Sequence, residues 1–173
     1  MRFTALTSFV AALAVLSVTA GPAQASVITT GDVDPGGAGT QPDPWAVGGT
    51  LKVGDSGSGT LNVKAGGVVA NTYGYIGLNS GSTGIATVTG SGSQWNNSLL
   101  YVGNYGSGTL NVEAGGVVAS ATGFIGNASV STGIATVTGS GSQWNNSNYL
   151  SVGISGSGTL NVKAGGVVAN TYG

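Results

Sequence analysis

Residues 61–70 read LNVKAGGVVA, and the chain repeats this stretch twice more. The second copy spans residues 110–119, where Glu113 replaces a lysine, and the third spans residues 160–169 and is identical to the first. Neighbouring copies are 49 and 50 positions apart. Self-similarity at a fixed period is the signature of repeat architectures. The sequence therefore predicts a chain that gains length by stacking equivalent units, rather than one that encloses a pocket.

A shorter period lies inside the long one. A four-residue motif with Leu or Gly first, Val or Ile third and Gly fourth recurs every 23 to 27 residues. That length is typical of one coil of a β-solenoid, with about three short strands separated by Gly, Ser and Asn turns. The predicted fold is all-β, a right-handed parallel β-helix of about five coils. The coils are expected to start near Leu51, Gly74, Leu100, Gly123 and Leu150.

Apolar residues alternate with polar ones in the expected strands, as in residues 60–64, so one side of each strand is predicted to face inward. Some coils lose volume at inward positions, at Gly74 and Ala86 or at Gly123 and Ala135, and these coils carry Trp95 and Trp144. Because an interior must stay close-packed, we expect each indole to fill the deficit of its own coil. One inward column is predicted to run through Leu61, Ala86, Leu110, Ala135 and Leu160.

The chain divides into three parts. Residues 1–25 are predicted to be a signal peptide, because Arg2 precedes an apolar run and residues 23–25 resemble a small-x-small cleavage site. Residues 26–50 depart from the period and hold Pro-Gly and Pro-Asp-Pro turns, so we expect a loose lead-in that begins to cap the first coil. The solenoid is expected to fill residues 51–173. It is predicted to continue past Gly173, since an uncovered edge is costly.

The composition offers little for catalysis. The chain has 4 Lys and Arg residues against 5 Asp and Glu residues, and it has no His and 0 Cys. A Ser or Cys triad would lack its base, and Asp55 and Glu113 are too far apart in sequence to suggest a carboxylate pair. Near neutrality also disfavours capture of nucleic acid. The glycine strings match neither phosphate-binding nor calcium-binding repeats. The sequence thus predicts no enzyme, no metal site and no cofactor.

One outward stripe is open to a functional interpretation. Tyr75, Tyr101 and Phe124 are expected to lie side by side on the solenoid wall, between Lys52 and Ser151. Exposed aromatic rings on a regular ladder can stack on sugars or dock a neighbouring molecule. The alternative is that the rings pack across strands and stiffen the stack. The three aromatic residues are the candidate binding residues.

Three short motifs match the acceptor for N-glycosylation. They begin at Asn96, Asn127 and Asn145. Chance accounts for such matches in a chain this rich in Asn and Ser, so they are not expected to be modified.

The repeat unit resembles that of a known group of bacterial proteins. The pattern from Val102 to Val118, followed by Gly133 to Trp144 with its Gly-Ser-Gln-Trp landmark, is similar to the repeat shared by passengers of type V autotransporters and by proteins with PEP-CTERM sorting tails. The resemblance covers roughly residues 45–173. It implies a bacterial, exported β-helical segment that is displayed at the outer membrane or released from the cell surface.

The expected function is that of a non-catalytic structural or adhesin-like segment. Its expected partners are extracellular polysaccharide, a host or neighbouring cell surface, or another copy joined through the solenoid ends. Contact with a membrane is expected only through a C-terminal domain outside this sequence. The alternative is that the repeats form a scaffold for an enzyme or binding domain beyond residue 173.

Overall fold

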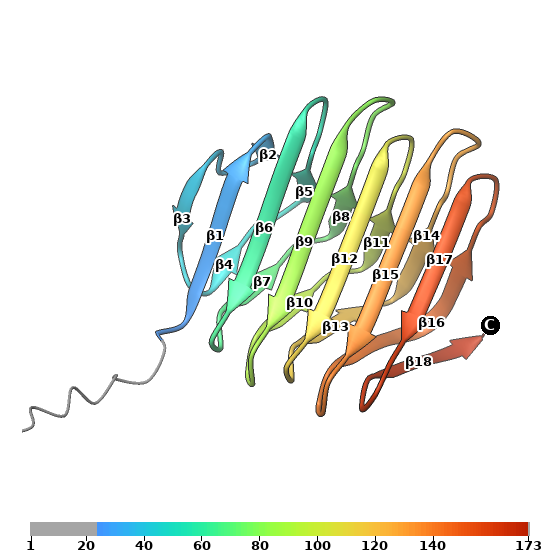
Figure 1. Cartoon of the computed structure of the whole chain (residues 1–173). Coiled ribbons are helices and arrows are strands. Elements are labelled where there is room, and N and C mark those ends of the chain that lie inside the picture. Colours follow the sequence, from blue (N-terminus) through green and yellow to red (C-terminus); the bar gives the residue numbers. More distant parts are fainter. Residues whose placement is uncertain (1–23, 173) are drawn as a thin grey trace, which may run out of the picture.

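The computed structural model describes residues 24–172, and within that range the chain forms 18 strands and no helix. The strands wind into a right-handed parallel β-solenoid of about five turns (Figure 1), which confirms the predicted fold class. The proposed signal peptide lies almost entirely outside the described residues, so it stays a prediction.

Each turn contributes a strand to three faces. The long-strand face is a row of five parallel strands. It contains β6 (Ser58–Lys64), β9 (Thr83–Thr89), β12 (Ser107–Glu113), β15 (Thr132–Thr138) and β17 (Ser157–Val162).

The chain then enters the short-strand face. This face contains β7 (Val68–Ala70), β10 (Gln94–Asn96), β13 (Val117–Ser120), the first part of β16 (Gln143–Val152) and β18 (Val167–Tyr172). The third face carries the aromatic stripe and is called the aromatic face below. It contains β5 (Thr50–Val53), β8 (Tyr73–Ile76), β11 (Leu99–Val102), β14 (Thr122–Ile125) and the end of β16.

The strand register matches the predicted columns. Leu61 pairs with Ala86, Ala86 with Leu110, Leu110 with Ala135, and Ala135 with Leu160. The first four of these side chains are fully buried. Each strand therefore places its alternate apolar residues in one continuous interior, as the period of two requires.

Two kinds of turn alternate along the stack. We call them leucine coils, which begin at Leu51, Leu100 and Leu150, and tryptophan coils, which begin at Gly74 and Gly123. Trp95 and Trp144 are fully buried, as predicted. A methyl group on Gly123 would lie 2.8 Å from Cζ2 of Trp144 and 2.7 Å from Cδ1 of Leu150, so the indole and a leucine fill the space that this glycine leaves.

Glycine is required where the aromatic face turns into the long-strand face. Gly103 has a φ of 73°, a left-handed conformation that suits glycine, and a side chain there would clash with the carbonyl of Thr132 in the next turn. A side chain on Gly108 would clash with the backbone of Gly103 itself. The same pair of glycines recurs in every turn, which explains why a chain with 34 glycines is ordered.

Residues 26–50 are more regular than the loose lead-in that the sequence suggested. Strand β1 (Ser26–Gly31) pairs antiparallel with β6 over its whole length, and β3 (Gly39–Gln41) pairs antiparallel with β1. Strand β2 (Val33–Asp34) adds to β5, and β4 (Trp45–Ala46) adds to β7. Residues 26–50 are ordered by strand pairing with the first coil and not by their own β propensity. Their turn-rich composition therefore did not predict these strands.

Candidate functional site

The aromatic stripe forms as the register predicted. Tyr75 pairs with Tyr101 and Tyr101 with Phe124, with Lys52 and Ser151 at the two ends. The ring centroids of Tyr75 and Tyr101 are 4.9 Å apart with an interplanar angle of 8°, and those of Tyr101 and Phe124 are 4.6 Å apart at 14°. The three rings are therefore stacked on one another along the solenoid axis.

This stacking bears on what the stripe can bind. A ring that stacks on a sugar must offer a free face, but both faces of Tyr101 lie against neighbouring rings. Only the outer edge and the phenol group of Tyr101 remain for a partner. Burial raises the pKa of the Tyr75 and Tyr101 phenols, so the stripe stays uncharged at neutral pH. The geometry favours the alternative interpretation, in which the rings stiffen the stack.

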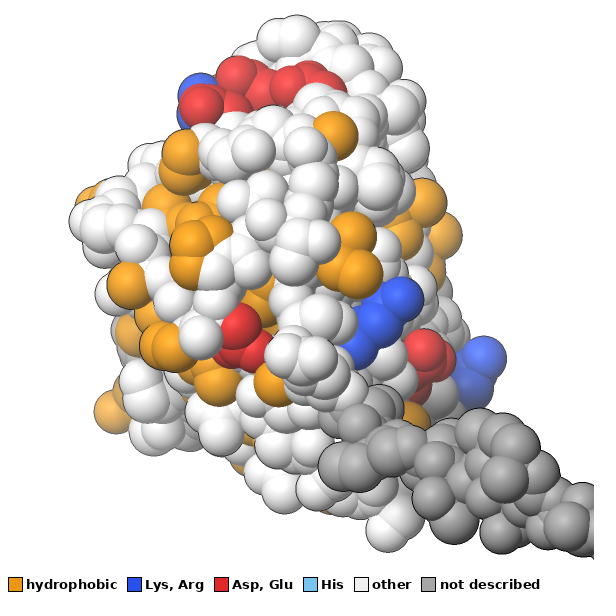
Figure 2. All heavy atoms as spheres, turned by 90° about the vertical axis from the view of Figure 1, so that its left-hand side faces the viewer, with side chains coloured by type: hydrophobic (Ala, Val, Ile, Leu, Met, Phe, Trp, Pro, Cys, Tyr) orange, Lys and Arg blue, Asp and Glu red, His pale blue; other side chains and the backbone are white. Residues whose placement is uncertain are grey.

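Charged residues cluster at the N-terminal edge. The ammonium group of Lys52 lies 3.0 Å from a carboxylate oxygen of Asp34 and 3.1 Å from one of Asp55, which ties β2 to the first coil. These carboxylates raise the pKa of Lys52, the hydrogen bond to Asp34 having the larger effect. Figure 2 faces this end of the molecule and shows small charged groups on a surface of mainly uncharged atoms. The cluster joins the cap to the solenoid.

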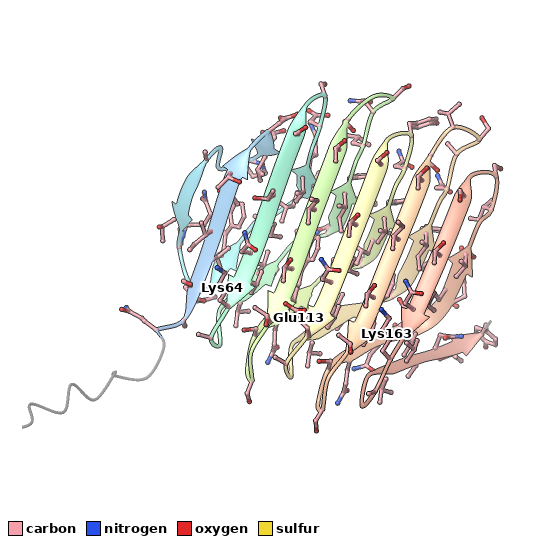
Figure 3. The ribbon with its side chains drawn as sticks, in the orientation of Figure 1. Lys64, Glu113 and Lys163 are labelled. Atoms are coloured by element: carbon pink, nitrogen blue, oxygen red, sulfur yellow. The ribbon has the colours of Figure 1, made fainter. Side chains whose placement is uncertain are left out.

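A second charged column marks the only difference between the three ten-residue copies. Lys64, Glu113 and Lys163 lie at the ends of the long strands (Figure 3). Thr89 separates Lys64 from Glu113, so the two charges are two coils apart, or about 9.6 Å. Their alternating sign avoids the repulsion that three lysines in one column would produce.

Within residues 24–172 there is no group of three or more His, Cys, Asp or Glu side chains that could hold a metal ion. The pairs Lys52–Asp34 and Lys52–Asp55 lie on the surface of the cap. The interior beneath the wall is filled by apolar side chains.

A groove follows the corner between the short-strand face and the aromatic face. It has a volume of about 610 Å³ and is open along one side. Four successive turns line it, through residues 96–98, 119–121, 145–147 and 169–171. All of these residues are Asn, Ser, Thr or Ala, so the groove carries no charged side chain.

Buried amides lie in the wall of this groove. The indole Nε1 of Trp144 donates to Oγ of Ser120 at 3.0 Å, and that hydroxyl donates to Oδ1 of Asn146 at 2.7 Å. The Nδ2 atom of Asn146 has no hydrogen-bond partner within the described residues, and neither end of the Asn97 amide has one. A buried amide without a partner costs about 1–3 kcal/mol. These atoms are buried, so this unused hydrogen-bonding capacity lies behind the groove surface and is not open to it.

Sequence reasoning missed this groove. Residues 96–98 and 145–147 stood out only as glycosylation acceptors, and residues 119–121 did not stand out at all. The available signal was the exchange of Asn for Ala between successive turns, at Asn96, Ala119, Asn145 and Ala169. That exchange becomes meaningful only when the register places these residues beside one another.

Comparison of the chain with protein-family models, with curated proteins and with solved structures finds no match. The resemblance to autotransporter and PEP-CTERM repeats thus remains a prediction from the residues alone. Within residues 24–172, no helix has the length and apolar character needed to cross a membrane. The geometry of the solenoid wall is the basis for assigning a function.

Proposed function

We propose that this chain is a non-catalytic, exported structural segment of a cell surface, with an adhesin-like role. The carrying observation is the uninterrupted interior. Buried apolar side chains run from Val27 to Trp144 through the first four turns, and partly buried Leu150, Leu160 and Val168 continue them into the fifth. Within residues 24–172 no group of three or more His, Cys, Asp or Glu side chains could hold a metal ion. A filled solenoid sets distance and stiffness, and it presents long side walls for contact.

The wall supports this role in two further ways. Each turn adds about 4.8 Å, so length depends only on the number of repeats. The stacked rings of Tyr75, Tyr101 and Phe124 link three turns on the outside, where no buried core holds the side chains in place. Both features favour rigidity over catalysis. The export step rests on the predicted signal peptide.

Localisation tests the proposal directly. An epitope tag inserted after Ser80, in an exposed turn of the first tryptophan coil, should become accessible to antibody and protease on intact cells of the source organism. The secreted form should begin at Ser26 by mass spectrometry. A matched variant, Leu13→Arg with Leu16→Arg, interrupts the apolar run and should keep the tagged chain inside the cell. A tag that stays inaccessible in both forms contradicts the proposal.

A further inference from the structure

The corner groove has a repeat of its own. Its outer column on the short-strand face runs Asn96, Ala119, Asn145, Ala169, each paired with the next. One carboxamide therefore faces the groove every two turns, or about every 9.6 Å. Ser98 and Ser147 also line the groove, and each comes two residues after its asparagine in the chain. A methyl-lined step, Ala119 with Ala121, lies between the two polar steps.

These groups define the chemistry of a partner. The groove offers amide and hydroxyl groups that both donate and accept hydrogen bonds, together with small apolar methyl groups. With no charge in its lining, it gives no attraction to phosphate, carboxylate or metal ions. A neutral sugar is complementary to this surface because its hydroxyl groups hydrogen-bond and its C–H faces pack on methyl groups.

The spacing between Asn96 and Asn145 indicates which type of sugar chain would fit the groove. In an extended β-1,4-linked hexose chain, alternate sugars are turned over, so the same edge returns at every second sugar. That disaccharide repeat is similar in length to the rise of two turns, about 9.6 Å. An α-1,4-linked chain curls and does not keep this straight repeat. The groove runs along the stack axis, as a straight chain would need.

Two tyrosines follow the groove residues closely along the chain. Tyr149 and Tyr172 are paired and lie beside the groove residues Ser147 and Thr171, and they are 38% and 65% exposed. The ring of Tyr149 is inclined at 82° to Phe124, so it does not continue the parallel stack. Unlike the ring of Tyr101, it is not held between two parallel rings. Tyrosine provides an apolar face together with a polar tip, which suits contact with a sugar.

We propose that this groove binds an extended, neutral β-1,4-linked polysaccharide, with Asn96 and Asn145 contacting successive disaccharide units. The amides of Asn97 and Asn146 are buried behind this surface and are not among the contacting groups. This proposal rests on the proposed function, because polysaccharides of this kind lie outside the cytoplasm and only an exported chain would meet them. It replaces the aromatic stripe with the corner groove as the contact surface.

The test measures binding of soluble hexasaccharides to purified protein by NMR titration and calorimetry. Cellohexaose, chitohexaose and mannohexaose are the β-1,4-linked probes. Maltohexaose is the curled control, and hexagalacturonate is the charged control. At least one β-1,4-linked probe should bind, and should do so at least tenfold more tightly than either control. Equal binding of maltohexaose, or no binding of any β-1,4-linked probe, overturns the proposal.

Matched variants locate the site. Asn96→Ala with Asn145→Ala should weaken binding at least tenfold. The fold tolerates this change because Ala119 already occupies the equivalent position between them. Asn62→Ala with Asn111→Ala removes two outward amides from the long-strand face and should leave binding unchanged. Tyr101→Ser tests the stripe, and it too should leave affinity unchanged.

If the groove variant binds as well as the parent, the groove is not the site. Circular dichroism and thermal unfolding of each variant show whether a loss of binding reflects a loss of fold. The assay uses purified protein, so its result is independent of localisation. If the protein is exposed on the cell surface but binds no hexasaccharide, the proposed ligand is wrong and the proposed function still stands.

Discussion

The leucine coils and the tryptophan coils solve one packing problem in two ways. A leucine coil fills its section with two leucines, such as Leu100 and Leu110. A tryptophan coil has Gly123 and Ala135 at the equivalent positions and fills the space from the short-strand face with Trp144. The comparison teaches that each turn must fill the same interior volume, but the residue at a given inward position can change from turn to turn.

The largest test removes the ring that defines a tryptophan coil. We expect Trp144→Ala to lower the free energy of unfolding by about 3–5 kcal/mol, because it opens a cavity and leaves the Ser120 hydroxyl without its donor. Denaturant unfolding followed by circular dichroism measures the change. Tyr105→Ala, at a ring that is 52% exposed, is the control and should have little effect. Equal losses in the two variants would mean that the indole is not a packing element.

The second test overfills the same coil. A methyl group at Gly123 would approach Trp144 and Leu150 within 2.8 Å, so Gly123→Ala should cost about 1–3 kcal/mol. In a Trp144→Phe background the far ring atom Cζ2 is gone, and the cost of Gly123→Ala should fall. A double-mutant cycle measures this coupling. Strict additivity would show that glycine and indole do not share one space.

The third test concerns the first leucine coil, whose N-terminal side is covered by the cap rather than by a tryptophan coil. Backbone N–H groups of Gly57 and Ser56 donate to the Asp32 carboxylate at 2.6 and 2.7 Å and hold its pKa below the ordinary 3.8, the bond from Gly57 having the larger effect. This contribution is present above pH 3.8 and is lost as pH falls through the lowered pKa of the folded state.

Asp32→Asn removes this titration while keeping an oxygen that accepts hydrogen bonds. Hydrogen exchange of the Ser56 and Gly57 amides should be faster in the variant at pH 6. The difference from the parent protein should shrink once the pH falls below 3.8. A difference that stays constant with pH would show that the carboxylate charge does not hold the cap.

The smallest expected effect lies at the end of the long strands. Leucine coils place Ala65 and Ala114 there with a φ of 50°, whereas the tryptophan coils have Gly90 and Gly139 at φ values of 92° and 91°. Ala114→Gly should relieve about 1–2 kcal/mol of left-handed strain and lose about 0.4–1 kcal/mol through the unfolded chain. The net expectation is a stabilisation of between about 0 and 1.6 kcal/mol. Thermal unfolding measures it, with Ala119→Gly as the control that should destabilise.

The repeats were enough to predict most of the fold. Copies at a spacing of 49 or 50 residues, and the echo of Leu51 at Gly74 and Leu100, indicated the number of coils and their register. Residues 26–50 escaped this reasoning because they match no repeat. Their order comes from antiparallel pairing of Val27 and Thr29 with Val63 and Leu61, a contact that local composition does not encode.

The candidate surface was only half predictable. The stripe of Tyr75, Tyr101 and Phe124 followed from the period, but whether its rings would stack on one another or stand free depends on side-chain orientation. The groove needed more, because it lies between two faces and combines residues from four turns. Asn96 and Ala119 are 23 positions apart in the chain and are neighbours only after the coils stack.

The sequence by itself determined the repeat length and the inward columns, because each follows from residue type and spacing along one dimension. Only the tertiary structure decided which ring faces are occupied, how the first coil is closed and where a groove opens. Those properties depend on the angle between faces and on the approach of side chains from different turns. Such distances are set by packing in three dimensions.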